Sequence, residues 1–486
     1  MTQQQLEKYL WGAATKLRGT IDAGDYKQYI FPLLFFKRIC DVYDEEFENA
    51  LKESDGDIEY ASFAENHHFL VPEGAHWNNV RETTVNVGLA LQNAMRDIEK
   101  ANPDTLYGIF GDASWTNKNR LSDETLTNLI EHYSQHKLSL SNIPDDKLGN
   151  AYEYLIKEFA DDSGHTAAEF YTNRTVVKLM TMIMNPQPGE SVYDPTCGSG
   201  GLLLNCALHL KDEGKEYRTL KLYGQEINLI TSAIARMNMF MHGIEEFSIV
   251  RGDTLANPAF LHNDELKTFN VILANPPYSI KAWDRKSFES DPYGRNIWGT
   301  PSQGCADYAF QQHMQKSLDP KNGRCISLWP HGVLFRDAEA EMRSKMIEED
   351  LVECVIGLGP NLFYNSPMEA CLLITTTNKE AHKKGKVLVI NAVKEVKQDK
   401  NIAFLEDKHI DKVYKTYKKF KDEEGFCKVL SLKEILDNKG SLNIAQYVSN
   451  VDTDIVQISI EDALQTWESS SEKLKDSMNE LFQILK

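Results

Sequence analysis

The chain has 486 residues, of which 42% are hydrophobic and 26% charged, and its formal net charge is −19 at pH 7. This length is too great for one hydrophobic core and predicts two or three domains, while the composition is ordinary for a folded globular protein. The acidic excess argues against a chain that coats nucleic acid by itself, because phosphate neutralisation by basic residues drives most non-specific binding.

Residues 1–165 are predicted to form a helical domain without β-rich stretches. Apolar residues recur near the helical period in a long stretch that begins at Asp25 and contains Tyr29, Leu33, Phe36, Val42 and Tyr43. The segments 123–136 and 147–159 are expected to be further amphipathic helices. The polar start of the chain is no signal peptide, and no apolar run is long enough to cross a membrane, so we expect a cytoplasmic protein.

Residues 166–440 are predicted to form an α/β domain, because short apolar runs there alternate with helical segments. The strand candidates are Ser191–Tyr193, Leu220–Tyr223, Ser248–Val250, Val271–Leu273, Cys325–Trp329, Val352–Ile356, Ala370–Thr375 and Val387–Ile390. Such alternation predicts a doubly wound, mostly parallel, Rossmann-like sheet. The short link over residues 378–386 predicts antiparallel pairing of the last strands at one edge. The eight cysteines form no CxxC pair, so no zinc or other metal site is expected.

Residues 441–486 are predicted to form a helical tail. Apolar residues follow alternating spacings of four and three, with one polar interruption, at Ile460, Leu464, Trp467, Ser471, Leu474, Met478, Leu481 and Leu485. This is a heptad seam, which packs against another helix. We favour docking on a partner subunit, and packing on the N-terminal helices of the same chain is the alternative.

Three candidate elements for binding a nucleoside follow one another in the α/β region. The strand at Val192 ends at Asp194 and enters the glycine-rich turn Asp194-Pro195-Thr196-Cys197-Gly198-Ser199-Gly200, which suits close approach to a ligand. Glu226, after the next strand, can accept hydrogen bonds from ribose hydroxyls, and Asp253, after the third, from an adenine amino group. The alternatives are a plain strand–helix turn, a solvated carboxylate and a turn-forming aspartate.

The strongest chemical signal is Asn275-Pro276-Pro277-Tyr278, directly after a buried-looking strand. An exocyclic adenine nitrogen is a poor nucleophile because its lone pair is delocalised into the ring. Hydrogen bonds from this amine to the Asn275 side-chain oxygen and the Pro276 carbonyl would favour a tetrahedral, nucleophilic nitrogen. The prolines fix these acceptors, and Tyr278 offers a face on which a flipped base can stack.

With these motifs the sequence resembles the modification subunits of type I restriction–modification systems, which are N6-adenine DNA methyltransferases. More specific stretches carry the resemblance: Glu169-Phe170-Tyr171-Thr172, the segment that starts Asp307-Tyr-Ala-Phe310, the segment Gly323–Arg336, Phe69-Leu-Val-Pro72 and Leu148-Gly149-Asn-Ala-Tyr152-Glu153. Asn173 departs from the proline usual after Tyr-Thr, Thr196 from an alanine, and Trp329 from an aliphatic residue. None of these departures touches the catalytic tetrad.

The resemblance implies S-adenosyl-L-methionine as cofactor. Glu169–Thr172 and Asp194–Gly200 would hold its methionine part, Glu226 its ribose and Asp253 its adenine. It also implies DNA as substrate, two such subunits on one specificity subunit that reads the sequence, and a motor endonuclease subunit for cleavage. The charge of −19 and the lack of an obvious target-recognition segment agree with an external DNA reader.

Other functions remain open from the sequence. Protein glutamine methylation is possible, because the same tetrad can position a carboxamide nitrogen. A catalytically silent scaffold subunit and N4-cytosine methylation are further alternatives. A basic, aromatic stretch at residues 412–421 can bind nucleic acid, but its helical spacing favours a helix with a solvated lysine face.

Overall fold

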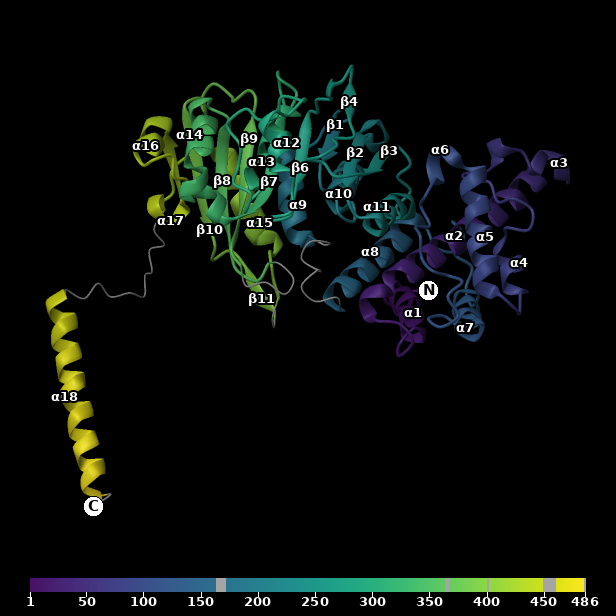
Figure 1. The fold of residues 1–486 in the computed structure, drawn as a ribbon, viewed down its shortest axis with the longest axis horizontal. Coiled ribbons are helices and arrows are strands. Elements are labelled where there is room, and N and C mark those ends of the chain that lie inside the picture. Colours follow the sequence, from purple (N-terminus) through teal and green to yellow (C-terminus); the bar gives the residue numbers. More distant parts are fainter. Residues whose placement is uncertain (163–171, 363–367, 400–401, 449–459, 485–486) are drawn as a thin grey trace. The chain divides into compact units, whose positions relative to one another are not determined.

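The computed structural model describes residues 1–162, 172–362, 368–399, 402–448 and 460–484 (Figure 1). The chain divides into two compact units, Met1–Val448 and Ser449–Lys486. The expected boundary between a helical and a catalytic domain near residue 165 lies among residues outside these ranges, so that division stays a prediction. Within the described ranges, the helices lack the length and apolar character needed to cross a membrane.

The described part of the N-terminal region is helical and contains no strand, as expected. Its α-helices are α1 (Gln3–Lys16), α2 (Lys27–Glu53), α3 (Ile58–Ala61), α4 (Trp77–Arg81), α5 (Val87–Ala101), α6 (Pro103–Leu106), α7 (Asp123–Tyr133) and α8 (Asp145–Asp162). The three helices expected from periodicity are therefore present as α2, α7 and α8. The helices α1 and α5 were not predicted individually, nor were the short helices α3, α4 and α6, whose few residues carry too little periodicity.

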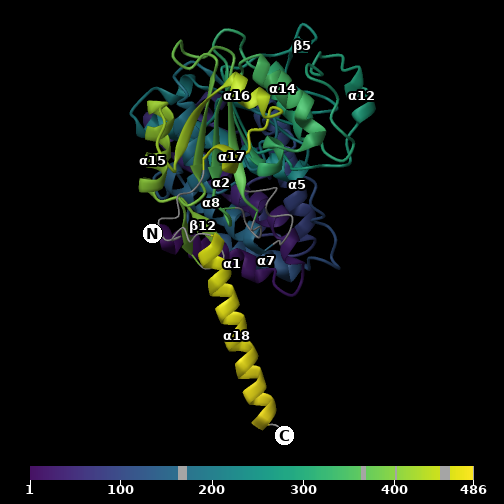
Figure 2. The same cartoon turned by 90° about the vertical axis from the view of Figure 1, so that its left-hand side faces the viewer.

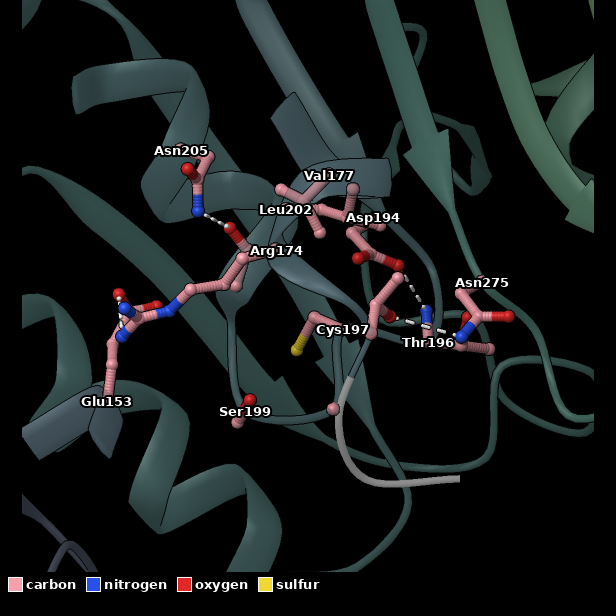
Figure 3. Close-up of a pocket in the computed structure, with 13 residues that line it drawn as sticks. Glu153, Arg174, Val177, Asp194, Thr196, Cys197, Ser199, Leu202, Asn205 and Asn275 are labelled. Carbon is pink, nitrogen blue, oxygen red and sulfur yellow. Dashed lines mark hydrogen bonds and ion pairs between the residues drawn. The ribbon is translucent and has the colours of Figure 1, made fainter. Parts of the chain in front are cut away.

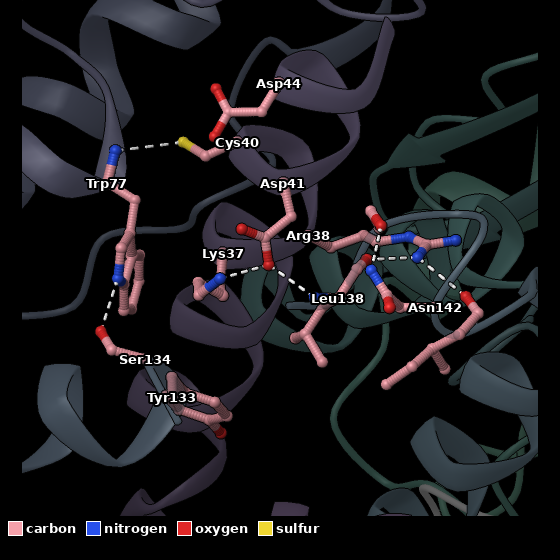
Figure 4. Close-up of polar contacts among 12 residues, drawn as sticks. Lys37, Arg38, Cys40, Asp41, Asp44, Trp77, Tyr133, Ser134, Leu138 and Asn142 are labelled. Carbon is pink, nitrogen blue, oxygen red and sulfur yellow. Dashed lines mark hydrogen bonds and ion pairs between the residues drawn. The ribbon is translucent and has the colours of Figure 1, made fainter. Parts of the chain in front are cut away.

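Helix α2 is the central helix of this region, and it buries charged as well as apolar side chains. Arg38 donates hydrogen bonds to the carbonyls of Leu138 and Ile143, and Asp41 accepts one from the Leu138 N–H at 2.6 Å (Figure 4). Buried charges are tolerated only when they are paired in this way. Because Arg38 also forms an ion pair with Asp145, the first residue of α8, α2 fixes the place at which α8 begins.

A nine-stranded sheet forms the centre of the α/β region, with strand order β13-β10-β8-β9-β7-β6-β1-β2-β3. All eight predicted strands are present, and Cys427–Ser431, a short edge strand, was missed. The strands are β1 (Ser191–Asp194), β2 (Lys221–Glu226), β3 (Phe247–Arg251), β6 (Val271–Ala274), β7 (Arg324–Pro330), β8 (Val352–Leu358), β9 (Ala370–Thr376), β10 (Lys386–Ala392) and β13 (Cys427–Ser431). Five of its pairs are parallel, which confirms the predicted fold class.

The prediction that the last strands pair antiparallel at one edge was wrong for β9. This strand lies inside the sheet, between β7 and β8 and antiparallel to both, while β10 runs parallel to β8. All residues of β9 are buried, so an interior position removes more apolar surface from water than an edge would. The short link to β10 crosses the start of β8, where Asp350 accepts hydrogen bonds from Lys379 and the Gly385 N–H. The antiparallel edge strand is β13.

Helices cover both faces of the sheet because successive strand residues point to opposite sides. Val192 belongs to one hydrophobic core and Tyr193 to the other. Figure 2 shows α15 on one side of the sheet and α14 on the other. The helices of this region are α9 (Arg174–Met184), α10 (Gly201–Asp212), α11 (Leu229–Met241), α12 (Arg285–Glu289), α13 (Asp307–Lys316), α14 (Ala340–Glu348), α15 (Asp407–Lys419), α16 (Leu432–Asp437) and α17 (Ile444–Tyr447).

Two short ribbons complete this unit, β4 (Leu261–His262) with β5 (Glu265–Leu266), and β11 (Lys397–Asp399) with β12 (Ile402–Phe404). Helix α11 connects the two regions, because Ala233, Ile234 and Met237 belong to the core of the N-terminal helices. Helix α15 buries Val413 and Tyr417 and leaves its lysines exposed, as the amphipathic interpretation predicted.

The second unit contains one long helix, α18 (Ile460–Ile484), at the position of the predicted heptad seam. Four seam residues with described side chains are large, apolar and exposed: Leu464, Trp467, Leu474 and Met478. Trp467 is the most exposed of them, at 67%.

Candidate active site

The candidate acids and the Asn275 loop lie at one edge of the sheet. Asp194 ends β1, Glu226 ends β2, Asp253 follows β3 by two residues, and Asn275 directly follows β6. These four strands are neighbours and parallel, in the order β6-β1-β2-β3, so their carboxyl ends share one side. This is the edge at which open α/β sheets bind ligands.

A cavity at this edge brings several predicted residues together (Figure 3). It is lined by Glu153, Thr172, Arg174, Val177, Asp194, Thr196, Cys197, Gly198, Ser199, Gly201, Leu202, Asn205 and Asn275. The predicted residues Glu169, Phe170 and Tyr171 lie outside the described residues. Pro195, Gly200, Glu226, Asp253 and Pro276–Tyr278 are not among the lining residues.

The glycine-rich turn adopts a backbone that other residues rarely take. Gly198 has φ 53° and Gly200 has φ 81°, both in the left-handed region. A Cβ on Gly200 would lie 3.0 Å from the Met239 methyl carbon on α11, so the turn also packs closely on that helix. Asn238 of the same helix donates a hydrogen bond to the Ser199 carbonyl at 3.1 Å. Helix α11 thus supports one side of the turn, and Thr196, Cys197, Gly198 and Ser199 of the turn line the cavity.

Two carboxylates hold this turn from its ends. Asp194 is buried and accepts a hydrogen bond from the Thr196 N–H at 3.0 Å. Burial raises the pKa of Asp194 to about 8, and the nearby Glu226 adds to this shift. Glu226 accepts hydrogen bonds from the Gly198 N–H at 3.1 Å and from the Asn228 N–H at 2.8 Å.

Asp253 forms the local turn that was the alternative interpretation of this residue. Its Oδ1 accepts hydrogen bonds from the N–H groups of Leu255, at 2.9 Å, and Ala256, at 3.1 Å. Gln225, which the sequence did not single out, fixes the same loop through the Asn257 carbonyl and the Ala259 N–H. A contact of Asp253 with adenine stays a prediction.

The Asn275 side chain is held in one orientation by two hydrogen bonds. Its Nδ2 donates to the Thr172 hydroxyl at 3.1 Å, and its Oδ1 accepts from the Tyr278 hydroxyl at 2.6 Å. In this orientation the amide oxygen faces the Tyr278 hydroxyl and the amide nitrogen faces the Thr172 hydroxyl. Thr172, expected on the cofactor side, also supports the tetrad. The Tyr278 ring lies 6.4 Å from that of Trp329, centroid to centroid.

Asn173, which departs from the expected proline, has a structural role. Its Oδ1 accepts a hydrogen bond from the Thr175 N–H at 3.0 Å and so caps the start of α9. Its Nδ2 donates to the Ala403 carbonyl at 3.1 Å, which ties the residue to β12. With a further hydrogen bond from the Thr175 hydroxyl to Oδ1, at 2.7 Å, the asparagine replaces the conformational restraint of proline with three hydrogen bonds.

The sequence missed an ion pair in the cavity wall. Arg174, the first residue of α9, lies 2.7 Å from Glu153 of α8, whose side chain is 8% exposed (Figure 3). Both residues line the cavity. Arg174 follows the Tyr-Thr motif at 171–172 by two residues, and Glu153 is the last residue of the motif at 148–153, but the pairing depends on tertiary structure.

The chain matches two family models and is similar in sequence and structure to known proteins. The family model for N-6 DNA methylases matches residues 144–454, and the model for the HsdM N-terminal domain matches residues 6–133. The methyltransferase subunit of a type I restriction–modification system from Streptococcus thermophilus has a similar structure, with a TM-score of 0.79. It is 30% identical over 92% of this chain and 100% of that chain.

Two curated relatives extend this similarity. The MjaVIII type I restriction enzyme methylase subunit of Methanocaldococcus jannaschii is 30% identical over 93% of this chain and 81% of its own length. The MpnII methylase subunit of Mycoplasma pneumoniae is 28% identical over 98% and 96%. The chain therefore belongs to the N-6 DNA methylase family and is a DNA adenine methyltransferase of the type I restriction-enzyme methylase subunit type.

Proposed function

We propose that this protein transfers the methyl group of S-adenosyl-L-methionine to N6 of an adenine flipped out of double-stranded DNA. It acts in the cytoplasm as the modification subunit of a type I complex, two copies with one specificity subunit, joined by a motor endonuclease subunit. The observation that carries the proposal is the Asn275 amide, whose oxygen is oriented by Thr172 beside a cavity with a glycine-rich turn.

The cavity suits an S-adenosylmethionine molecule. Its glycine turn lets a ligand approach the backbone, and Thr172, Thr196 and Ser199, which carry hydroxyl groups, line the cavity. Asp194, Gly198 and Ser199 would hold the methionine part together with Thr172, while Glu226 would hold the ribose and Asp253 the adenine. When bound, the cofactor supplies an electrophilic sulfonium methyl group.

The loop residues activate the acceptor nitrogen by hydrogen bonding. The Asn275 oxygen and the Pro276 carbonyl would accept hydrogen bonds from the two amine N–H groups, which localises the nitrogen lone pair for attack. Pro276 is buried, so its carbonyl is fixed by the surrounding structure. After transfer the methylated nitrogen is cationic and would lose one proton to solvent, so the loop needs no strong base beforehand. Tyr278, next to Asn275 and partly exposed, offers its ring to the flipped base.

The proposed partners follow from charge and from α18. A chain of net charge −19 gains little from phosphate contacts, so another subunit must supply much of the DNA affinity. The exposed seam of α18 offers apolar knobs at heptad spacing, which is the pattern that packs on partner helices. Both features support a specificity subunit that brings the DNA to the Asn275 loop.

The function is tested with the complex reconstituted from this chain and its specificity subunit. We expect label from radioactive S-adenosylmethionine to enter cognate duplex DNA, and mass spectrometry of the digested DNA to show N6-methyladenine. Label in protein instead would indicate glutamine methylation, and N4-methylcytosine would indicate a different base. A complex that binds both cofactor and unmethylated cognate DNA without transfer would support the scaffold alternative.

The raised pKa of Asp194 predicts proton release on cofactor binding. Near pH 7 this carboxyl is mostly protonated in the free protein, and a bound cation favours its ionised form. The affinity for the cofactor should therefore rise with pH, by up to about tenfold per pH unit, between about pH 6 and about pH 7.5. In this range the amino group of the cofactor remains mostly charged. Calorimetric titration in two buffers of different ionisation enthalpy measures the number of protons released on binding. The Asp194→Asn variant should bind the cofactor more weakly and release no proton. Proton uptake by the wild-type protein would contradict the ionisation of Asp194 on binding.

The Glu153–Arg174 pair predicts a contact with the amino-acid end of the cofactor, which carries one charge of each sign. We expect Glu153→Gln to lower the affinity for S-adenosylhomocysteine about ten- to a hundredfold, since hydrogen bonds to charged groups contribute about 1.5–3 kcal/mol. The affinity for 5′-methylthioadenosine, which lacks the amino acid, should stay the same. Calorimetric titration of both ligands shows whether the loss of affinity is confined to the ligand that carries the amino acid.

The matched control is Glu131→Gln. Glu131 pairs with Arg81 at 2.7 Å in the same helical region, but both side chains are nearly half exposed and lie outside the cavity lining. Equal losses for both ligands in Glu153→Gln would indicate a general disturbance of the cavity and refute the contact.

A further inference from the structure

The residue that follows the catalytic tetrad has an unfavourable backbone. Ser279 has φ 51°, in the left-handed region that non-glycine residues rarely adopt. It ends the turn that Pro276 and Pro277 begin, directly after Tyr278. Strained backbone at a functional loop persists only when the surrounding structure holds it. The contacts of Ser279 therefore show what fixes the end of the tetrad.

Three side chains contact Ser279, and the longest of these contacts is from the Cys305 thiol to the Ser279 hydroxyl, at 3.9 Å. Asp307, the first residue of α13, is fully buried and accepts a hydrogen bond from the Ser279 N–H at 2.6 Å. Arg336, in the segment after β7, donates to the Ser279 hydroxyl at 3.3 Å. Arg336 also forms an ion pair with the second oxygen of Asp307, so both contacts belong to one network. The backbone and the side chain of Ser279 are thus held at once.

Glu339 completes the network through Arg336 and Cys305. Its carboxylate lies 3.0 Å from the Arg336 Nε and accepts a hydrogen bond from the Cys305 thiol at 3.3 Å. Cys305, Asp307 and Glu339 also offer three ligand atoms within 4.8 Å of one another, the spacing of a metal site. The Arg336 guanidinium already pairs with both carboxylates, so the described contacts favour an ion-pair network over a cation site.

We propose that Asp307 and Arg336 are positioning residues for methyl transfer, which hold Ser279 and thereby aim the acceptors of the Asn275 loop. The proposal rests on the proposed function, because the loop acceptors are those of the transfer step. β6 and Thr172 fix the start of the tetrad, and this network fixes its end. Neither residue lines the cofactor cavity, so the effect falls on the chemical step and not on cofactor binding.

The test compares kcat with cofactor affinity in the complex with the specificity subunit. Asp307→Ala should lower kcat about ten- to a hundredfold with unchanged affinity for S-adenosylhomocysteine. Ser279→Gly, placed in the Asp307→Ala background, should restore part of this loss, because glycine takes the left-handed conformation without support. A double variant no faster than Asp307→Ala would overturn the proposal, as would a parallel loss of cofactor affinity.

A second variant keeps the test independent of the buried carboxylate. Ser279→Val should lower kcat with Asp307 intact, because a β-branched residue resists positive φ, and full activity in this variant would refute the proposal. Asp337→Ala, an exposed aspartate next to Arg336, is the matched control and should keep the wild-type kcat. Absence of N6-methyladenine from the wild-type complex would instead refute the proposed function, so the two failures are distinguishable.

Discussion

Replacement of Asn275 by alanine should reduce methyl transfer by about a hundred- to a thousandfold, or more, at unchanged cofactor affinity. The variant removes the amide oxygen that accepts a hydrogen bond from the amine, and loss of one such preorganised hydrogen-bonding group costs about 2.7–4 kcal/mol in transition-state stabilisation in other enzymes. The Asn275 amide also joins Thr172 to Tyr278, so the tyrosine loses its partner as well. Single-turnover transfer to cognate DNA measures the chemical step directly.

A graded comparison separates the oxygen from the rest of the side chain. Asn275→Asp keeps an acceptor of the same shape, and the Thr172 hydroxyl can donate to its other oxygen, so this variant should retain more activity than alanine. Asn322→Ala, in an exposed turn before β7, is the matched control and should transfer at the wild-type rate. Wild-type transfer by Asn275→Ala would show that the tetrad is not the catalytic loop.

Replacement of Trp467 and Leu474 by glutamate should abolish stable association with the specificity subunit. These exposed residues are one heptad apart on α18, and buried aromatic and aliphatic anchors carry much of the energy of helix interfaces. We expect binding more than about a hundredfold weaker, since losses of at least about 2 kcal/mol are typical of a hot-spot residue. Light scattering after size-exclusion chromatography of the mixed subunits measures the loss.

Charge alone must be ruled out as the cause. Gln465→Glu with Ser469→Glu adds the same two negative charges at exposed positions outside the seam, so this pair should still associate. Cofactor binding should be normal in both double variants, because the cavity lies wholly in the first unit. Normal association of the Trp467 and Leu474 variant would favour the alternative that the seam packs on the N-terminal helices.

The sequence predicted those parts of the fold that depend on local pattern. Each of the eight strands is a short apolar run, and α2, α7 and α8 have helical periodicity. The position of β9 in the sheet depends instead on which of several apolar strands lies in the interior, and no local pattern specifies this. The short link over residues 378–386 suggested a hairpin. The link crosses β8 because Asp350 holds it there, a contact between residues that no sequence pattern connects.

The candidate site shows the same division. The order of the glycine turn, Glu226 and the Asn275 loop predicted one shared edge, because parallel strands place their ends together. The pairing of Glu153 with Arg174, the hydrogen bond from Asn275 to Thr172 and the hold of Asp307 on Ser279 join separate segments through tertiary packing. Distances of this kind are fixed only when the helices have docked on the sheet.

The position of Glu153 has a consequence for dissecting the protein. Helix α8 belongs to the helical region, yet it supplies one wall of the cavity and the carboxylate that faces Arg174. A fragment that begins at residue 166 would keep the whole sheet but would expose that side of the cavity to solvent. Helical region and sheet therefore form one binding unit, and occupancy by cofactor would report whether the two halves are assembled.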